Sequence, residues 1–458
     1  MVTEKLKLKE KVGYGFGDAA SSMFWKLFSM YLMFFYTDIF GISAAVVGTM
    51  FLVTRIWDAA FDPVVGIIAD RTASRWGKFR PYILFGAIPF GIAGVLTFTT
   101  PSFGLTGKII YAYITYSAMM MLYSLVNVPY ASLLGVMSSD GKERTTLSSF
   151  RMVFAFGGSI LALALVNPLV QFFGGDTAGK EQRAWQLSIV VFAIIAAILF
   201  YFTFSWTRER VKPIKAEKVS LKYDLKDLLA NRPWWILLGS GISALIFNSI
   251  RDGAAIYYFK YFVQNQDLVS IYLVLGQAFN IVGIIFVTPL ANRFGKKTTY
   301  FYAMVIATVL SIAFYWLNAD NIILIIVLQC LISICAGSIF PLLWSMYADI
   351  ADYSEYKTGR RATGLIFSSS SMSQKFGWTL GGALTGWLLA IYGFKANVVQ
   401  TSEVQSGIRM MLSIFPAVGT ILSVLFIYIY PLNEKMMADI SIKLTNKRDG
   451  VSSLNPVE

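Results

Sequence analysis

Two aspartates and an arginine lie in one apolar stretch, Arg55-Ile-Trp-Asp58-Ala-Ala-Phe-Asp62-Pro63. Arg55, Asp58 and Asp62 recur at helical spacing, so a helix would place all three on one face. Pro63 lacks a backbone N–H and leaves the carbonyl of Ala59 without its usual donor. Charges inside a membrane-spanning helix are costly and indicate an ion or substrate pathway. The alternative is a structural ion-pair cluster, which two acids and one local base would leave incomplete.

Other apolar stretches also carry polar and aromatic side chains, including Ser124, Asn127, Tyr130, Arg151 and Lys375. Amides, hydroxyls and ring faces together suit a sugar, because a hydroxyl-rich ligand needs many donors and acceptors. Taken singly, each of these residues would more often make a helix–helix hydrogen bond. Their spread over several stretches favours a shared central cavity.

The sequence argues against catalysis. It has no histidine, which excludes histidine proton relays and histidine metal sites, and it has no Walker or zinc motif. Cys330 and Cys335 share one apolar stretch and are expected to be packing residues. We therefore expect neither an enzyme nor a cofactor.

The elements that position these residues are predicted to be membrane-spanning helices. Hydrophobic residues make up 56% of the chain and charged residues 14%, whereas a soluble protein carries about 25% charged residues. Apolar runs of about 20 residues, long enough to span a bilayer, recur along the chain. We predict an all-α polytopic membrane protein with twelve spans, near residues 13–37, 44–69, 81–100, 109–135, 149–172, 185–206, 234–262, 267–291, 298–317, 321–347, 362–392 and 408–431.

The spans fall into two similar halves. A hydrophilic linker, 207–233, separates six-helix bundles at 1–206 and 234–431, and a polar tail follows at 432–458. Two basic turns recur at nearly the same spacing: Arg75-Trp-Gly-Lys-Phe-Arg80 corresponds to Arg293-Phe-Gly-Lys-Lys297, and Gly141-Lys-Glu-Arg144-Thr-Thr to Gly359-Arg-Arg361-Ala-Thr363. Two such repeats predict homologous halves with a cavity between them that opens to one side at a time.

The net charge of +13 reports orientation rather than a nucleic-acid partner. Lys and Arg concentrate in the N-terminus, the even-numbered loops and the tail. The odd-numbered loops carry only Lys108, Lys180, Arg183, Lys395 and Arg409. By the positive-inside rule, both termini are expected in the cytoplasm. The expected partners are the lipid bilayer, a small solute and a monovalent cation, with the chain as a monomer.

With these motifs assembled, the chain resembles the glycoside–pentoside–hexuronide:cation symporters of the major facilitator superfamily, among them the melibiose carriers. The similarity covers nearly the whole chain. Its strongest marks are Tyr14-Gly-Phe-Gly17, Tyr36-Thr-Asp38, Arg55-Ile-Trp-Asp58 with Asp62-Pro63, Arg75-Trp-Gly-Lys-Phe79 and Ala348-Asp-Ile-Ala-Asp352-Tyr-Ser-Glu355-Tyr-Lys357. It implies symport of a sugar, glycoside, pentoside or hexuronide with Na⁺ or H⁺ across a bacterial inner membrane.

The resemblance also implies roles for single residues. Asp58 and Asp62 match the coupling-cation site, and Ser124 matches a hydroxyl that helps to bind the cation. Arg151 and Lys375 match basic residues that tie the cation site to the sugar site. Cation binding would neutralise the acid pair and stabilise a sugar-ready state, which is a coupling free energy between two sites.

Several positions depart from the melibiose carriers. An asparagine of their cation site is Phe61 here, so the choice between Na⁺ and H⁺ stays open. Two aspartates that hold the galactosyl ring fall on Ser22 and Asn127, and two stacking tryptophans fall on Ala131 and Phe340. Galactoside recognition therefore does not carry over. The candidate substrate-binding residues are Ser22, Trp57, Asn127, Tyr130, Arg151, Arg251, Asp252, Phe340 and Lys375.

The pair Arg251-Asp252 occupies positions that are uncharged in melibiose carriers. Loss of two acids and gain of an arginine would suit a sugar acid such as a hexuronide. The alternative is that Asp252 simply neutralises Arg251, as intramembrane pairs commonly do.

Other charged residues are candidates for gates that latch the halves through ion pairs: Asp18, Arg55, Asp70, Arg71, Arg75, Arg144, Asp352 and Arg361. Rival functions are a transporter for another solute, such as a lipid or drug, and a cation-independent facilitator. A lipid or drug carrier would need an apolar cavity, so Arg151 and Lys375 count against it.

Overall fold

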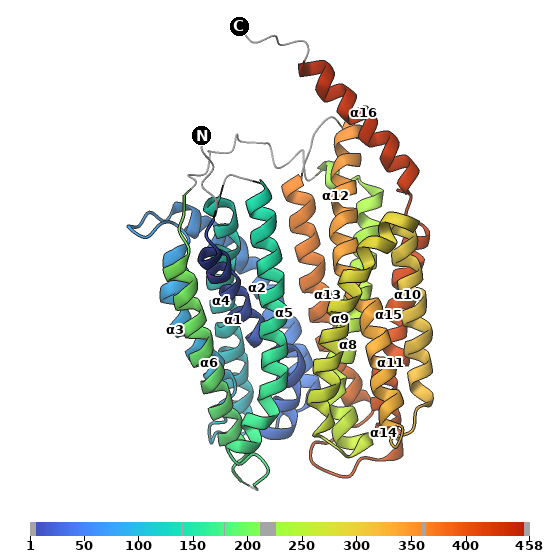
Figure 1. Cartoon of the computed structure of the whole chain (residues 1–458). Coiled ribbons are helices and arrows are strands. Elements are labelled where there is room, and N and C mark those ends of the chain that lie inside the picture. The colour runs from blue at the N-terminus through green and yellow to red at the C-terminus, as the bar shows by residue number, and fades with distance from the viewer. Residues whose placement is uncertain (1–5, 139–140, 178, 211–225, 359–362, 453–458) are drawn as a thin grey trace. The chain divides into compact units, whose positions relative to one another are not determined.

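The computed structural model describes residues 6–138, 141–177, 179–210, 226–358 and 363–452. Regular structure in these ranges is helical, with no strand, and Figure 1 labels the helices. Of the linker predicted at 207–233, residues 226–229 form a helical turn, and residues 211–225 lie outside the described ranges. The predicted fold class, an all-α protein, is confirmed.

The first six long helices run in chain order with short connections (Figure 1). They are α1 (Leu8–Leu27), α2 (Ala44–Arg71), α3 (Arg80–Thr97), α4 (Leu105–Met137), α5 (Gly141–Phe172) and α6 (Glu181–Trp206). Two π-helical segments, η1 (Phe28–Leu32) and η2 (Phe35–Phe40), extend α1 until Gly41, whose φ of 87° ends the helix. Helix α2 runs on through Pro63, as the sequence predicts.

The second series is more interrupted. It comprises α8 (Arg232–Tyr257) with a π-helical extension η3 (Tyr258–Val263), α9 (Leu268–Phe294), α10 (Lys296–Ala313) with the short η4 (Phe314–Trp316), α11 (Ile322–Gly337), α12 (Ile339–Thr358), α13 (Thr363–Ile391), α14 (Ser402–Leu412), α15 (Ile414–Tyr428) and α16 (Glu434–Ser452). The predicted span at 321–347 is thus built from α11 and α12, and the one at 408–431 from α14 and α15.

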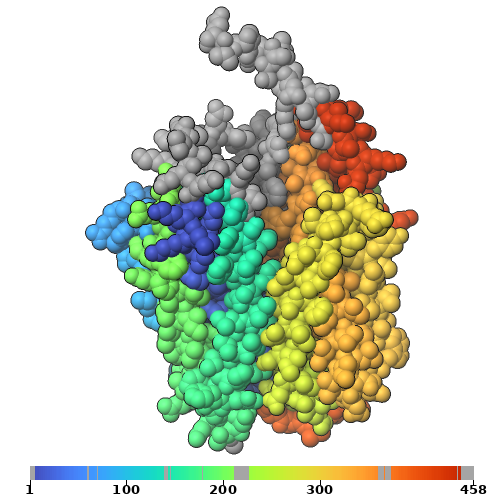
Figure 2. Space-filling view, viewed as in Figure 1, coloured from blue at the N-terminus to red at the C-terminus, as the bar shows by residue number. Residues whose placement is uncertain are grey.

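Ten helical stretches among the described residues are long and apolar enough to cross a membrane. They confirm a polytopic membrane protein. The predicted count of twelve adds α1 with its π-helical extensions, and α13, which are helical over comparable lengths. Large apolar side chains line the outer face of α6, where Ile194, Ile198 and Tyr201 are each at least half exposed, and Figure 2 shows this helix among the green atoms. Such a face suits contact with lipid.

The chain packs into two compact units. The first comprises Met1–Lys215, Asp252–Gln277 and Gly382–Ile408; the second comprises Ala216–Arg251, Ala278–Gly381 and Arg409–Glu458. The first unit therefore contains α1 to α6 together with one end of each of α8, α9, α13 and α14. The division into bundles at 1–206 and 234–431 stays a prediction, because these units follow packing and cut across it.

Helix α1 is central to the first unit, where it packs most extensively against α5 and α6. Glycines make this approach possible. A Cβ added at Gly15 would lie 2.4 Å from the ring of Phe154, and one added at Gly158 would lie 2.4 Å from the carbonyl oxygen of Ala19. The second of these contacts is with backbone, so only a glycine fits on α5 without a shift of one helix.

Candidate functional site

The structure places Asp58 of α2 in a buried polar cluster of the first unit. Its side chain is 2% exposed. Ser124 of α4 donates to Oδ1 at 2.8 Å, and Arg55 donates to Oδ2 at 3.3 Å. The Arg55 guanidinium lies 4.5 Å from the ring centre of Trp25 on α1. Asp58 thus joins α2 to α4, and through Arg55 it reaches α1.

Asp62 lies one helical turn beyond Asp58 on the same helix and is half-buried, as is Phe61 before it. The Oδ1 atom of Asp62 is shielded from solvent. Within the described part of the chain, no group of three or more Cys, Asp or Glu side chains is arranged to hold a metal ion. A cation at Asp58 and Asp62 would therefore draw its other oxygens from hydroxyls such as Ser124, from backbone carbonyls or from water.

Arg151 of α5 forms a second polar cluster in the same unit. It donates from Nε to Asp18 of α1 at 2.8 Å. Tyr130 lies beside it, with the guanidinium 5.4 Å from its ring centre, and its hydroxyl donates to the Tyr14 carbonyl at 2.7 Å. Two predicted residues with different roles, Asp18 and Arg151, therefore form one ion pair between α1 and α5.

Three further predicted substrate residues also belong to this unit. Asn127 of α4 lies between Ser124 and Tyr130 in sequence, and its buried Oδ1 has no hydrogen-bond partner among the described residues. Ser22 of α1 is half-buried. Trp57 is 58% exposed on α2. A buried amide oxygen without a donor is costly in a folded protein, and this oxygen keeps its capacity to accept a hydrogen bond.

Arg251 takes protein partners inside the second unit. Its side chain donates to Gln329 of α11 at 2.5 Å, to Ser311 of α10 at 3.5 Å and to the carbonyl of Leu412 at the end of α14. The residue is 4% exposed. These contacts pin α8 to the break between α14 and α15, a structural role that sequence reasoning did not anticipate.

Asp252 contacts Lys26 of α1, with 3.4 Å between its Oδ2 and the Lys26 ammonium. The alternative that Asp252 neutralises Arg251, which the sequence leaves open, stays a prediction. Lys26 was missed as a candidate because its charge in the sequence has no local acidic partner at helical spacing.

The remaining predicted substrate residues, Lys375 of α13 and Phe340 of α12, belong to the second unit and are half-buried. Among the predicted gating residues, Arg144 donates to the carbonyls of Ser138 at 2.7 Å and Gly135 at 3.0 Å, at the end of α4. Arg75 lies over the ring of Trp76. Their gating role stays a prediction.

Three more predicted gating residues lie on helices. Arg71 is exposed at the end of α2, and Asp352 is half-buried on α12. Asp70 belongs to α2, but its side chain is not described, and Arg361 lies outside the described residues.

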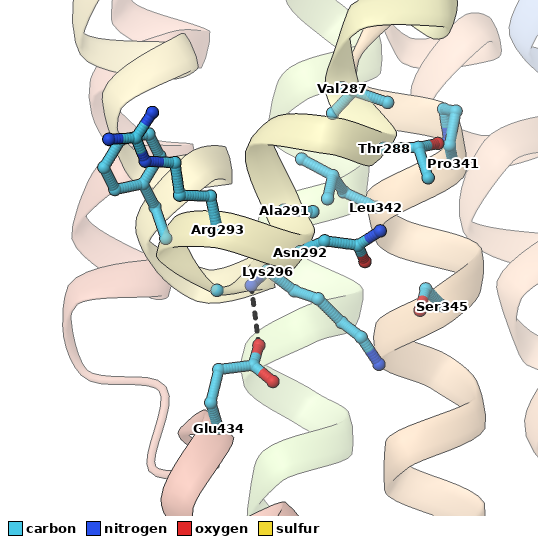
Figure 3. Close-up of a pocket in the computed structure, with 12 residues that line it drawn as sticks. Val287, Thr288, Ala291, Asn292, Arg293, Lys296, Pro341, Leu342, Ser345 and Glu434 are labelled. Carbon is cyan, nitrogen blue, oxygen red and sulfur yellow. Dashed lines mark hydrogen bonds between the residues drawn. The ribbon is translucent and has the colours of Figure 1, made fainter.

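A cavity of about 480 Å³ in the second unit lies at the α9–α10 turn (Figure 3). Glu434 accepts from the backbone N–H of Lys296 at 2.6 Å, and the Lys296 ammonium contacts Asp349 of α12 at 2.7 Å. The first unit repeats this cap, since Glu209 accepts from the backbone of Lys78 at 2.9 Å and Phe79 at 2.8 Å. Each repeated basic turn thus receives a carboxylate from the chain after the sixth span of its half. The residues at this cavity therefore serve as caps and ties between helices.

Comparisons with known proteins agree with these observations. The family model described as MFS/sugar transport protein matches residues 13–434. The inner membrane symporter YicJ of Escherichia coli (strain K12) is 39% identical and covers 92% of this chain and 91% of its own length. The isoprimeverose transporter of Lactiplantibacillus pentosus is 37% identical, with coverage of 95% and 91%.

A solved structure shares the fold. It is the crystal structure of a bacterial homolog of the human lysosomal transporter Spinster in an inward-facing and unoccupied conformation. The TM-score is 0.72 at 12% sequence identity, and the match covers 94% of this chain and 97% of that one.

Proposed function

The chain belongs to the MFS/sugar transport family, and from this premise we propose that it carries a sugar or glycoside across the membrane together with a cation. The predicted resemblance to sugar:cation symporters is thereby confirmed at the level of family. Members of this family are transporters and not enzymes. A relative named as an isoprimeverose transporter supports a glycoside as the substrate class.

The observation that carries the proposal is the environment of Asp58. A carboxylate that is 2% exposed in a membrane-spanning helix needs compensation, and Arg55 and Ser124 supply it. A cation that arrives at Asp58 would compete with Arg55 for the same oxygens. Its binding would release the guanidinium, which stacks on Trp25 of α1. Ion binding on α2 would thus alter α1, the helix that carries Ser22.

The sugar half of the site is proposed around Asn127, Ser22 and Tyr130, with Arg151 beside them. The unsatisfied Asn127 oxygen can accept from a sugar hydroxyl, and the Asp18–Arg151 pair can reorganise to offer further donors. Coupling then means that cation binding lowers the free energy of the sugar-bound state. Inward movement of one positive charge gains about 2.3 kcal/mol per 100 mV, which suffices for uphill uptake.

The orientation proposed for this transporter follows the charge pattern. Lys and Arg lie mainly in the N-terminus, even-numbered loops and tail, which favours cytoplasmic termini in a bacterial inner membrane. The name of the Escherichia coli relative supports that location. We propose a monomer as the transporting unit.

Uptake by purified protein in vesicles tests the proposal. Vesicles with a sodium gradient alone and with a proton gradient alone are compared, with isoprimeverose as the first probe. Asp58→Asn and Asp62→Asn should abolish concentrative uptake, because each removes a carboxylate that the cation would neutralise. Asp320→Asn, in an exposed turn, is the matched control and should accumulate substrate normally. Full accumulation by both site variants would refute the proposal.

A cation-independent facilitator is the second candidate. The observation in its favour is that Arg55 already pairs with Asp58, as a purely structural pair would. Facilitated diffusion brings the internal substrate only to the external concentration. Accumulation above that level under either gradient excludes it.

A further inference from the structure

A cluster around Asp38 has no role in the proposed cation or sugar site. Asp38 lies in η2 at the end of α1, and its side chain is fully buried. The Lys260 ammonium contacts Oδ1 at 2.8 Å, and the Tyr261 hydroxyl donates to the same oxygen. Thr37 lies 2.7 Å from Oδ2. A buried carboxylate with so many donors is held in one position.

The loop between α13 and α14 completes the cluster. Asn397 donates to the backbone carbonyl of Asp38 at 2.6 Å and accepts from Lys260 at 2.8 Å. Its backbone N–H donates to the Tyr261 hydroxyl at 2.9 Å. Asn397 adopts a φ of 58°, which few residues other than glycine tolerate. The Asp38 cluster, defined as Asp38, Lys260, Tyr261 and Asn397, thus links three segments that are far apart in sequence.

The two π-helical segments that meet here correspond to each other. η2 and η3 each contain six residues, and each ends at a residue with positive φ, Gly41 at 87° and Gln264 at 58°. The backbone N–H of Ile42 donates to the carbonyl of Tyr36 at 3.0 Å, and that of Asn265 donates to the carbonyl of Phe259 at 3.0 Å. The same number of residues separates Ile42 from Asn265 as separates Tyr36 from Phe259. π-helical turns are rare in proteins, and those that occur often lie at functional sites.

The correspondence extends to the contact itself. Phe34 precedes η2 and Tyr257 precedes η3, again at the same offset, and their rings pack edge to face with 6.0 Å between centres. The Lys260 ammonium lies 4.8 Å from the ring centre of Phe34. On the N-terminal side of the cluster along both helices, Lys26 and Asp252 add a second ion pair between them. Two ion pairs therefore join the first helices of the two predicted halves. The first of these helices supplies the acid in one pair, Asp38, and the base in the other, Lys26.

A second close contact between helices, that of α13 with α2, lies in the same unit. A Cβ added at Gly386 of α13 would lie 2.4 Å from the carbonyl oxygen of Ala44 of α2. Trp387 of α13 also donates to Thr49 of α2 at 3.2 Å. The unit therefore holds the ends of α8 and α13 against α1 and α2.

We propose that the Asp38 cluster is an outer gate latch that closes the end of the transporter away from the chain's N-terminus and must break in every cycle. The inference rests on the proposed transport function. Alternating access requires that the two halves separate on each side in turn, and the cluster ties them on one side. Asp38 is its hub, since every other member bonds to it. Loss of one charge would leave its partner buried without compensation and would favour the open state.

A labelling experiment tests the latch without requiring substrate or ion. In a variant with Cys330→Ala and Cys335→Ala, the single cysteine Ala44→Cys reports the covered face of α2, where Ala44 is 6% exposed. A membrane-impermeant maleimide is added to intact cells. Asp38→Asn and Lys260→Met should each raise the labelling rate roughly tenfold, because the open state becomes more populated. The exchanged pair Asp38→Lys with Lys260→Asp should restore slow labelling.

Asp267→Asn is the matched control, because Asp267 is also an outer-end carboxylate of this unit. Among the described residues its side chain accepts a single hydrogen bond, from Gln171 at 2.9 Å in an exposed pair. It should label like the parent. Unchanged labelling in both latch variants would overturn the inference, and labelling that rises equally in the control would overturn it as well. Failure of the sugar symport proposal would appear in uptake and leave these labelling rates as they are.

Discussion

At the scale of single residues, Asp58 is constrained by partners from two directions. Ser124 reaches it from α4, and Arg55 reaches it from the preceding turn of α2. If Asp58 binds the coupling cation as proposed, the ion competes with Arg55 for Oδ2, so its affinity should depend on how readily Arg55 leaves. Trp25 stabilises the guanidinium in place through a cation–π contact, which is worth about 2 kcal/mol when desolvated.

Phe61 lies between the two acids and should influence which cation couples. Phe61→Asn would add an amide oxygen, and hard ions such as Na⁺ prefer several oxygen ligands. We expect the ratio of sodium-driven to proton-driven uptake to rise in this variant, measured in vesicles under each gradient alone. Phe61→Leu keeps the position apolar and serves as the control. Equal ratios in the two variants would show that this position does not select the ion.

At the scale of elements, α1 is fixed by close contact with α5. The Asp18–Arg151 pair joins these helices, and Gly158 allows their backbones to touch. A polar pair inside a membrane protein is oriented by the packing around it. The position of Arg151 therefore depends on a glycine two helical turns away on the same helix.

Gly158→Ala should destabilise the protein by about 1–3 kcal/mol, because the new methyl group would clash with the backbone of Ala19. The measurement is the Tm of purified protein in detergent. Gly157→Ala is the matched control, since a Cβ there meets no atom of the described residues within 4 Å. Alanine is also the better helix former, by about 1 kcal/mol. A Tm for Gly158→Ala equal to that of the control would contradict the tight crossing.

At the scale of the whole molecule, the internal repeat in the sequence has counterparts in the structure. The two basic turns of the repeat receive equivalent carboxylate caps from Glu209 and Glu434. The π-helical ends η2 and η3 are equivalent as well. Equivalent positions thus recur both at the basic turns and at the Asp38 cluster, and the division of the chain into two homologous halves predicts such a recurrence.

The charge pattern also predicts the orientation of the chain. A green fluorescent protein fused after residue 452 should fluoresce, because a cytoplasmic C-terminus lets it fold. Alkaline phosphatase fused there should be inactive, whereas fusion after Lys395, in an odd-numbered loop, should be active. The opposite pattern of phosphatase activity would reverse the proposed topology and place the Asp38 cluster on the inner side.

The sequence by itself determined the class of protein, the family and the central acid pair. Apolar runs specify membrane helices because the bilayer requires them, and helical spacing places Asp58 and Asp62 on one face. The tertiary structure decided which distant residues meet. Asp252 reaches Lys26, and Asp38 reaches Lys260, because the rotation of each helix is set by packing against its neighbours and not by its own sequence.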